Sequence, residues 1–331
     1  MKSKCFIGID VSKETLDLFV LSRQYHFQAL NEESDYARLL ELCCSQGNCS
    51  PSDLFFCFEN TGRYSRLLSA FFTESGINYA MVPAMEIKKS LGMKRGKSDR
   101  ADARAIANYA WQHKEELKPS RINSALAGEL RQLLTLRDKL IRHRTAYKNS
   151  INDLKDVLYE GETAVIRQVH NRMITNLNKE IENVDQRIED LIATAHDWQN
   201  NYRLIQTVRG IGPVLAKYIL IYTENFCRIN NPRSFACYAG VAPFEYSSGT
   251  SVKGRTRVHP CANKQLKSLL NTAAMCAIQL PGEYKTYFQR RTAEGKNKMS
   301  TLNIIRNKLI GRAYATVRRQ TPYVDLTRFA A

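Results

Sequence analysis

"KCFIGIDVSKETLDLFVLSRQYHFQAL", residues 4–30, decides the fold of the amino-terminal part of the chain. Residues 4–11 form an apolar run, and residues 16–21 and 25–30 form two more short runs rich in aliphatic and aromatic side chains. Short apolar runs separated by a few polar residues are typical of β-strands joined by tight turns. The chain is therefore predicted to begin with three consecutive strands.

Helices and strands alternate in the sequence that follows. The pattern predicts, in order, a helix over 31–47, a strand over 53–59, a helix over 63–76 and a strand over 77–82. Helical pattern then runs from residue 84 to about 113, with a Gly/Lys-rich break at "GMKRGKSD" (92–99). Three strands followed by helix, strand, helix, strand and helix is the element order of a ribonuclease-H-like fold, although other α/β folds share it.

The remainder of the chain is predicted to be mostly helical. After a linker at 114–124, the seam of a coiled coil is indicated by apolar residues that alternate four and three apart: Leu177, Ile181, Val184, Ile188 and Leu191. With a turn near Gly161, this pattern predicts a long antiparallel helical hairpin. We expect a multidomain α/β plus α protein, with a ribonuclease-H-like domain over 1–115, the coiled-coil hairpin over 116–200 and a mostly α domain over 201–331.

The composition favours a polyanionic partner. The formal net charge is +17 and the pI about 9.5, an excess that points to nucleic acid and says nothing about fold. No run reaches the roughly 18 apolar residues of a membrane span, and "MKSKCFIGID" is too short an apolar stretch for a signal peptide. The nine cysteines are scattered without a CxxC pair, which indicates reduced thiols in a cytosolic protein. The six histidines are scattered as well, which argues against a His-rich metal site.

Four acids stand out by their positions. Asp10 interrupts the first apolar strand, where a carboxylate is costly unless it is paired or binds a metal. Glu59 ends the fourth strand, and Asp99 and Asp102 are three apart in "KSDRADARAIA", which places both on one face of a helix. Strands one and four are neighbours in a ribonuclease-H-like sheet, and a third helix can lie across their ends. The four carboxylates are therefore expected to come together.

Such a cluster repels itself at neutral pH, and a divalent cation relieves the repulsion. Hard oxygen ligands favour Mg²⁺, with Mn²⁺ as an alternative. Two ions roughly 3.5–4 Å apart could stabilise the entering and leaving oxygens of a phosphodiester displacement. A DxxD pair alone is more often an N-terminal helix charge than a pair of ligands, so the predicted metal site depends on all four acids in this order.

A second candidate reactive segment is "FEYSSGTSVKGRTR", residues 244–257. Serine is a poor nucleophile until its proton is removed or its charge is stabilised, and attack on DNA phosphorus also requires positive charge at the non-bridging oxygens. Lys253, Arg255 and Arg257 are of the right type and close by, and Gly249 leaves room for a phosphate. Taken alone, such a segment is more often a glycine-serine surface turn.

Two further patterns indicate contacts with nucleic acid. In "VRGIGPVLA" (208–216), Gly210 and Gly212 lie between two predicted helices, as in a helix-hairpin-helix segment whose backbone N–H groups approach a phosphate. A helix turn that merely needs glycine is at least as common. The predicted hairpin carries a basic side with Arg137, Arg142 and Arg144, although charges that only solvate a helix are an equal alternative.

Six motifs together carry a resemblance to a known family. "GIDVSKETLDLFVL", "FENTGRY", "KSDRADARAIA", "VRGIGPVLA", "RSFACYAGVAP" and "SSGTSVKGRTR" occur in the order seen in the insertion-sequence-110 family of transposases, which has Piv-type site-specific DNA invertases as close relatives. The resemblance extends over nearly the whole chain. Two positions depart from the family pattern, at Asn60 and in "VHPCANKQLKSLL", and both lie outside the residues proposed for catalysis.

The resemblance implies a RuvC-type domain with a DEDD metal site formed by Asp10, Glu59, Asp99 and Asp102, and a C-terminal transposase domain with Ser248 as the catalytic serine. It implies Mg²⁺-assisted cutting and rejoining of DNA through a 5′-phosphoserine link. It also implies target and donor duplexes chosen by a structured bridge RNA. Dimers would assemble into tetramers, with the carboxylates of one subunit facing the serine of another. The expected location is the bacterial cytoplasm, at the nucleoid.

The candidate nucleic-acid contacts are basic or glycine residues, namely Lys94, Arg95, Lys97, Arg100, Arg137, Arg142, Arg144, Gly210, Gly212, Lys253, Arg255 and Arg257. Three alternatives stay open. A Piv-like invertase would share the chemistry. A metal-dependent junction endonuclease would need the acids but not Ser248, and a non-catalytic nucleic-acid-binding protein would need only the charge.

Overall fold

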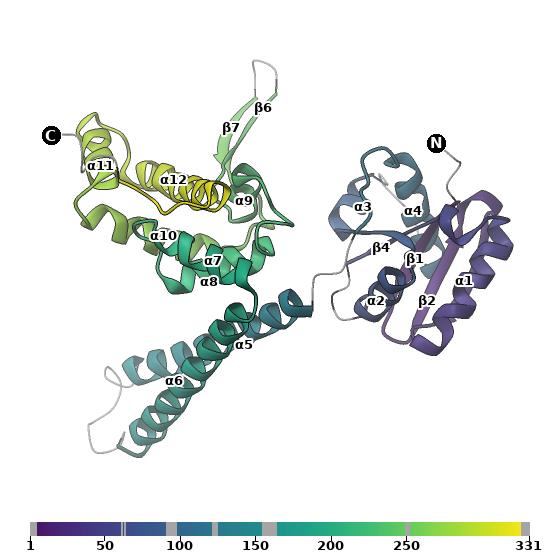
Figure 1. Cartoon of the computed structure of the whole chain (residues 1–331), viewed down its shortest axis with the longest axis horizontal. Coiled ribbons are helices and arrows are strands. Elements are labelled where there is room, and N and C mark those ends of the chain that lie inside the picture. Colours follow the sequence, from purple (N-terminus) through teal and green to yellow (C-terminus); the bar gives the residue numbers. More distant parts are fainter. Residues whose placement is uncertain are drawn as a thin grey trace. The chain divides into compact units, whose positions relative to one another are not determined.

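The computed structural model describes residues 5–60, 62, 64–90, 98–120, 125–153, 164–248 and 252–325 (Figure 1). The chain divides into two compact units, Met1–Ile122 and Asn123–Ala331. Each unit has hydrophobic clusters of its own.

A five-stranded mixed sheet with the order β3–β2–β1–β4–β5 forms the centre of the first unit. Its strands are β1 (Cys5–Val11), β2 (Thr15–Val20), β3 (Tyr25–Leu30), β4 (Leu54–Glu59) and β5 (Asn78–Val82). Strand β1 pairs antiparallel with β2 and parallel with β4, and β5 is parallel to β4. The three initial strands and the neighbouring positions of the first and fourth strands are confirmed. This mixed sheet is consistent with the expected ribonuclease-H-like fold.

Helices cover both faces of the sheet. Helices α1 (Glu33–Gly47) and α2 (Arg66–Glu74) pack on the face that carries Ile7 and Ile9, whereas α3 (Ala84–Ser90) and α4 (Asp99–Gln112) pack on the face that carries Phe6. The alternation of side chains along β1 produces these two clusters. Short 3-10 turns, η1 (Leu21–Arg23) and η2 (Pro51–Asp53), follow β2 and precede β4.

The contact between α4 and β1 is unusually close, and it depends on Gly8. A β-carbon added to Gly8 would meet the backbone of α4, at the Ala103 carbonyl and at Ala107 N and Cα. Backbone atoms cannot move aside as a flexible side chain can, so only glycine allows the helix to lie this near the strand. The contact fixes the start of α4 beside the end of β1.

In its described residues the second unit is mostly helical and contains one β-hairpin. Its helices are α5 (Ala125–Asp153), α6 (Ala164–Ala193), α7 (His196–Gln206), α8 (Pro213–Thr223), α9 (Pro232–Tyr238), α10 (Lys264–Gln279), α11 (Glu283–Ala293) and α12 (Lys298–Arg319). Strands β6 (Phe244–Ser248) and β7 (Val252–Arg257) form an antiparallel ladder (Figure 1). The sequence did not predict this hairpin.

Helices α5 and α6 pack side by side and antiparallel, as expected of the helical hairpin (Figure 1). Three contacts show the register: Arg137 to Asp185 at 2.9 Å, Arg144 to Asn178 at 3.0 Å and Arg187 to Glu129 at 2.9 Å. Ile181, Val184 and Ile188, which belong to the predicted seam, are buried. Supercoiling of the pair stays a prediction.

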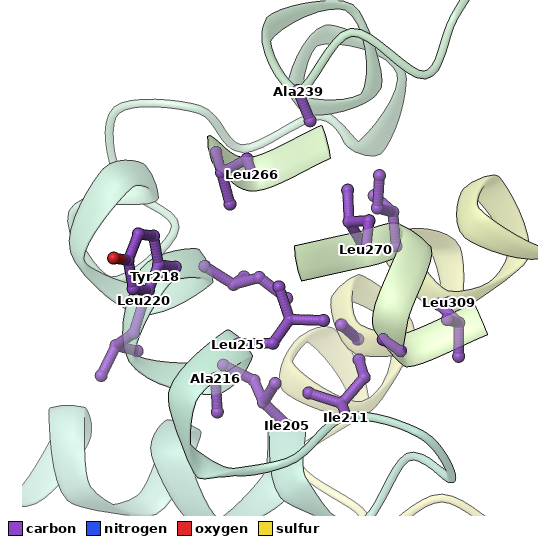
Figure 2. Packing of buried hydrophobic residues seen from close by; sticks show 14 of the residues in the cluster. Ile205, Ile211, Leu215, Ala216, Tyr218, Leu220, Ala239, Leu266, Leu270 and Leu309 are labelled. Carbon is purple, nitrogen blue, oxygen red and sulfur yellow. The ribbon is translucent and has the colours of Figure 1, made fainter. Parts of the chain in front are cut away.

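One hydrophobic cluster joins the base of this helix pair to the helices that follow. It extends from Leu130 and Ile188 to Leu215, Leu270 and Leu309. Figure 2 shows Leu215 of α8 among side chains from α10 and α12. Residues 116–200 and 201–331 therefore share a core, and their division into two functional domains stays a proposal.

Candidate active site and nucleic-acid surfaces

The ends of β1 and β4 bring two of the predicted acids to one edge of the sheet. Ile9 pairs with Phe58 in the parallel ladder, so Asp10 and Glu59 follow at the same level on adjacent strands. Both side chains are partly buried. The topology thus explains why acids almost fifty positions apart in the sequence are neighbours.

The other two acids come from the first turn of α4. The Ser98 hydroxyl caps this helix by accepting a hydrogen bond from the Ala101 N–H at 3.2 Å, so that Asp99 and Asp102 lie in the first turn. Carboxylates are favoured there by the helix dipole, which is the ordinary reason for a DxxD pair. The close packing of α4 on Gly8 adds a second consequence, because it places this turn beside Asp10.

Electrostatics show that the acids influence one another. The pKa of Asp10 is raised from 3.8 to about 6, first by burial and then by the charges of Asp102, Asp99, Glu59 and Asp17, in that order of importance. All four predicted acids therefore belong to one electrostatic cluster. Negative charge collects at the point where β1 ends.

Asp17 is a fifth acid of this cluster, and sequence reasoning missed it. It is 6% exposed, and it is held by two side chains of β3: His26 Nε2 lies 2.8 Å from its Oδ1, and Gln28 Nε2 donates to Oδ2 at 3.2 Å. The signal that singled out Asp10, an acid inside an apolar strand, is also present in "LDLFVL".

Within the described ranges, no three His, Cys, Asp or Glu side chains lie close enough together to hold a metal ion. The donor set nevertheless fits a divalent cation in kind, since it consists of carboxylate oxygens whose mutual repulsion a hard cation would relieve. The raised pKa of Asp10 is the observation that supports this fit.

The serine segment forms the end of a β-strand. Ser248 is the last residue of β6 and pairs with Val252, while Ser247 pairs with Lys253. A register shift between Phe244 and Tyr246 interrupts the ladder near its base. Residues 249–251, which include Gly249 and Ser251, lie outside the described residues. The side chains of Ser247, Ser248, Lys253, Arg255 and Arg257 also lie outside the described part, so these residues are placed by their backbone alone.

The two glycines of "VRGIGPVLA" have different surroundings. Gly210 has φ +91°, and a β-carbon there would meet Ala273 O and Ala277 Cβ of α10, each at 2.8 Å. Its need for glycine is therefore explained by backbone conformation and close packing. Gly212 lies just before α8 with nothing within 4 Å of a β-carbon. Gly212 thus leaves open space before the N-terminus of α8.

Arg137 requires a correction to the expected nucleic-acid surface. Its side chain is 7% exposed, and its Nε donates to both carboxylate oxygens of Asp185 at 2.9 Å. The same carboxylate accepts from Lys217 Nζ at 2.7 Å, so that Asp185 lies between two buried cations. Arg137 is therefore engaged inside the protein, where it is paired with Asp185.

The remaining basic candidates differ in accessibility. Arg100 and Arg142 are exposed, and Arg144 is half-buried and donates to Asn178 Oδ1 at 3.0 Å. The distal half of the helix pair, residues 139–153 and 164–179, has Asp153 as its one acid. Exposed cations on it form what we call the distal basic surface: Lys139, Arg142, Lys148, Arg172 and Lys179. Lys94, Arg95 and Lys97 lie outside the described residues.

Among the described residues, which include all nine cysteines, no disulfide bond is formed, and the reduced state of the thiols stays an expectation. Among the helices that the structure describes, none is both long and apolar enough to cross a membrane.

Comparisons with known proteins agree along most of the chain. A family model described as "Transposase", for the DEDD transposases of IS110, matches residues 7–159, and a model described as "Transposase IS116/IS110/IS902 family" matches residues 202–289. The pilin gene-inverting protein of Moraxella bovis is 24% identical over 328 residues, which are 97% of this chain and 98% of the relative. The transposase for insertion sequence element IS1111A of Coxiella burnetii is 24% identical over 200 residues, 54% of each chain.

The class of protein follows from these matches, together with the acid-rich edge of the sheet and the basic helical unit. The protein is an enzyme, a DNA transposase or recombinase, and its substrate is DNA. The chain belongs to the IS110 family of transposases.

Proposed function

We propose that the enzyme cuts and rejoins DNA through Ser248, assisted by the acids Asp10, Glu59, Asp99 and Asp102. The observation that carries the proposal is the convergence of acids from the ends of β1 and β4 and from the first turn of α4, which the raised pKa of Asp10 accompanies. Burial is the first cause of that raised pKa, and the charges of acids from β4 and α4, which separate motifs supply, add to it. A site that accumulates repelling carboxylates at a cost in stability suits chemistry better than packing.

The four acids would hold Mg²⁺, or Mn²⁺, which when bound supplies positive charge to stabilise an oxygen anion at the scissile phosphate. The chain's own contribution is nucleophilic. Ser248 Oγ gives up its proton to solvent and bonds to phosphorus, while the bond from phosphorus to the 3′ oxygen of the neighbouring nucleotide breaks and that oxygen takes up a proton from solvent. The resulting 5′-phosphoserine ester keeps the free energy of the cleaved bond, so rejoining needs no ATP.

Lys253, Arg255 and Arg257 share β7, the strand paired with the serine strand. We propose that they neutralise the phosphate that Ser248 attacks, because attack on a phosphodiester is impeded by its negative charge. The acids belong to one compact unit and Ser248 to the other. This division would fit a tetramer in which one subunit supplies the acids and another supplies the serine.

A structured bridge RNA is the proposed guide, with sequence choice left to base pairing. The net charge of +17 and the distal basic surface support binding of RNA and DNA backbones. Gly212 and exposed Arg100 are proposed as further phosphate contacts. We place the protein at the nucleoid of the bacterial cytoplasm, where both nucleic acids are available.

Site-specific inversion is a second candidate role. The Moraxella bovis relative is called a pilin gene-inverting protein, and its match covers 97% of this chain. Inversion and transposition share strand cleavage and rejoining. The two roles can therefore be distinguished only by the DNA that flanks the gene. A structured non-coding segment beside the gene favours the RNA-guided transposase, and an invertible segment favours the invertase.

The test is a covalent-adduct assay. Purified protein is incubated with its RNA, Mg²⁺ and end-labelled DNA, and the products are separated on a denaturing gel before and after protease digestion. We expect a protease-sensitive adduct that Ser248→Ala abolishes, whereas Ser247→Ala and Ser251→Ala, the matched neighbours, retain it. Full cleavage by Ser248→Ala would instead identify a metal-dependent endonuclease.

A further inference from the structure

Arg306 of α12 is a buried cation without a partner of opposite charge. Its side chain is 5% exposed, and among the ion pairs of the described residues none includes it. Its hydrogen bonds go to two neutral amides, from NH2 to Asn271 Oδ1 at 2.7 Å and from NH1 to Asn303 Oδ1 at 3.4 Å. Its Nε is buried without a hydrogen-bond partner. The guanidinium thus carries an uncompensated charge inside the second unit.

Such a charge does not stabilise a fold. Removing a cation from water is costly, and only an ion pair with good geometry offsets the loss. The usual arrangement of a buried cation, an ion pair, occurs in the same unit, where Arg137 is paired with Asp185 at 2.9 Å. An apolar residue at position 306 would avoid the cost. The presence of arginine therefore calls for a function other than packing.

The geometry shows what the guanidinium controls. An arginine can only donate hydrogen bonds, so Asn303 must turn its Oδ1 toward Arg306. The other end of the same amide, Nδ2, is then directed to the Val241 carbonyl, to which it donates at 2.8 Å. Arg306 thus fixes the orientation of an amide that would otherwise be free to rotate by half a turn.

Val241 lies at the root of the β6–β7 hairpin. Its carbonyl also accepts from Asn307 Nδ2 at 2.9 Å, so both of its lone pairs are used by side chains of α12. Strand β6 begins three residues later, at Phe244, and ends at Ser248. Two asparagines of α12 therefore hold the carbonyl that precedes the serine strand, and Arg306 orients one of them, Asn303.

We propose that Arg306 is a positioning residue for the serine step, acting through Asn303 and Val241 on the root of the hairpin. This inference rests on the proposed nucleophilic role of Ser248. A misplacement of about 1 Å can slow a reaction about a hundredfold, so a fixed root has kinetic value even where it stabilises nothing.

Arg306→Met tests the proposal, since it removes the charge and keeps an unbranched side chain of similar reach. At saturating DNA, adduct formation should be about ten- to a hundredfold slower, while the Kd for DNA changes by less than about twofold. The melting temperature should stay the same or rise, because an uncompensated buried charge is removed. Arg306→Lys, which can still donate to Asn303, should recover part of the rate.

Asn303→Asp tests the contact between Asn303 and Val241 separately from the contact between Asn303 and Arg306. It keeps an acceptor for Arg306, and even pairs its charge, but it loses the donor to Val241. We expect the same slow adduct formation as in Arg306→Met, with no further loss in the double variant because the two residues act in series. Arg318→Met, which removes an exposed charge from the same helix, serves as the matched control and should keep the wild-type rate.

Hydrogen exchange makes the test independent of the chemistry. Amides of residues 241–248 should exchange faster in Arg306→Met and Asn303→Asp than in the wild type and in Arg318→Met. Unchanged exchange, or an adduct rate that falls only together with the melting temperature, overturns the positioning role. Absence of any adduct in the wild type instead overturns the proposed role of Ser248, and the exchange result then still decides whether Arg306 orders the hairpin root.

Discussion

Asp10 and Asp17 are directly paired across the antiparallel β1–β2 ladder. Residues paired in this way share a face of the sheet, and like charges there oppose each other. Asp17 is stabilised by Gln28, which donates to it at 3.2 Å, and by His26 at 2.8 Å. Burial and the surrounding acids raise the pKa of Asp10 instead. The two acids therefore differ. Side chains of β3 contact the carboxylate of Asp17, whereas burial and neighbouring acids disfavour the charged form of Asp10.

The raised pKa of Asp10 predicts how stability depends on pH without divalent cations. The folded state holds this proton up to about pH 6, whereas the unfolded chain releases it near the ordinary value of 3.8. The folded state thus binds more protons between these values, so stability falls as the pH rises through them and stays reduced above. Asp10→Asn should melt higher than the wild type in EDTA at about pH 8, and the difference should vanish below about pH 4. A lower melting temperature for Asp10→Asn at the higher pH would contradict the repulsion.

Mg²⁺ should raise the melting temperature of the first unit, because an ion that binds only the folded state stabilises it. The shift should disappear in Asp102→Asn, whose carboxylate is the acid that most strongly affects Asp10. Asp17→Asn, in which hydrogen bonds from β3 can persist, is the matched control and should keep the shift. Differential scanning calorimetry with and without Mg²⁺ measures both, and equal shifts in Asp102→Asn and the wild type would argue against the acid site.

Gly8→Ala should destabilise the first unit by about 1–3 kcal/mol, at the upper end of that range because the added methyl group meets backbone atoms of α4. Gly212→Ala is the matched control, since nothing lies within 4 Å of its β-carbon, and it should cost about 1 kcal/mol or less, from the weaker N-cap alone. Urea denaturation measures both changes. Equal stability of the two variants would mean that α4 is free to lift away from β1.

Asp185→Asn should destabilise the second unit by about 3–5 kcal/mol, because it leaves two buried cations without their shared anion. These are Lys217, which is 3% exposed, and Arg137. Glu189→Gln removes a neighbouring but more exposed carboxylate, 2.9 Å from Lys217, and should cost about 1 kcal/mol or less. Guanidinium denaturation distinguishes the two, and a loss below about 1 kcal/mol in Asp185→Asn would show that water reaches the pair.

Charge reversal on the distal basic surface should weaken RNA binding. Arg142→Glu combined with Lys148→Glu should lower affinity and reduce the slope of log K against log salt by about one for each phosphate that the variant no longer neutralises. Arg187→Glu, at the other end of the helix pair, is the control and should leave the slope unchanged. A filter-binding titration at several salt concentrations checks this, and identical slopes for all three proteins would remove the surface from the proposal.

Much of the first unit could be predicted because its signals are local. The apolar runs of β1 to β5 were short and bounded by polar residues, and strand pairing then followed from the element order. The convergence of Asp10 and Glu59 was predictable for the same reason. Repulsion among the four acids was predicted as well, but its effect on the pKa of Asp10 needed the structure, because that effect depends on burial and on the packing of α4 against Gly8.

Other features could not be predicted from the sequence. Strand β7, "VKGRTR", has three charges and a glycine, so its propensity for a strand is weak and pairing with β6 decides its conformation. Arg137 and Arg142 look alike in the sequence, yet one is paired with Asp185 inside the unit and the other is exposed. Burial of a charge depends on partners from distant helices, which a single sequence does not indicate. Asp17, in contrast, could have been found, because it interrupts an apolar strand as Asp10 does.

The missing side chain at Gly8 has a consequence for how such enzymes can diverge. Main chain rests on main chain there, so the separation between the strand that carries Asp10 and the helix that carries Asp102 does not depend on the sizes of the surrounding core residues. Core substitutions can accumulate over evolutionary time without altering that spacing, provided that the glycine is retained. Relatives with little overall identity could in this way inherit one unchanged distance between their acids.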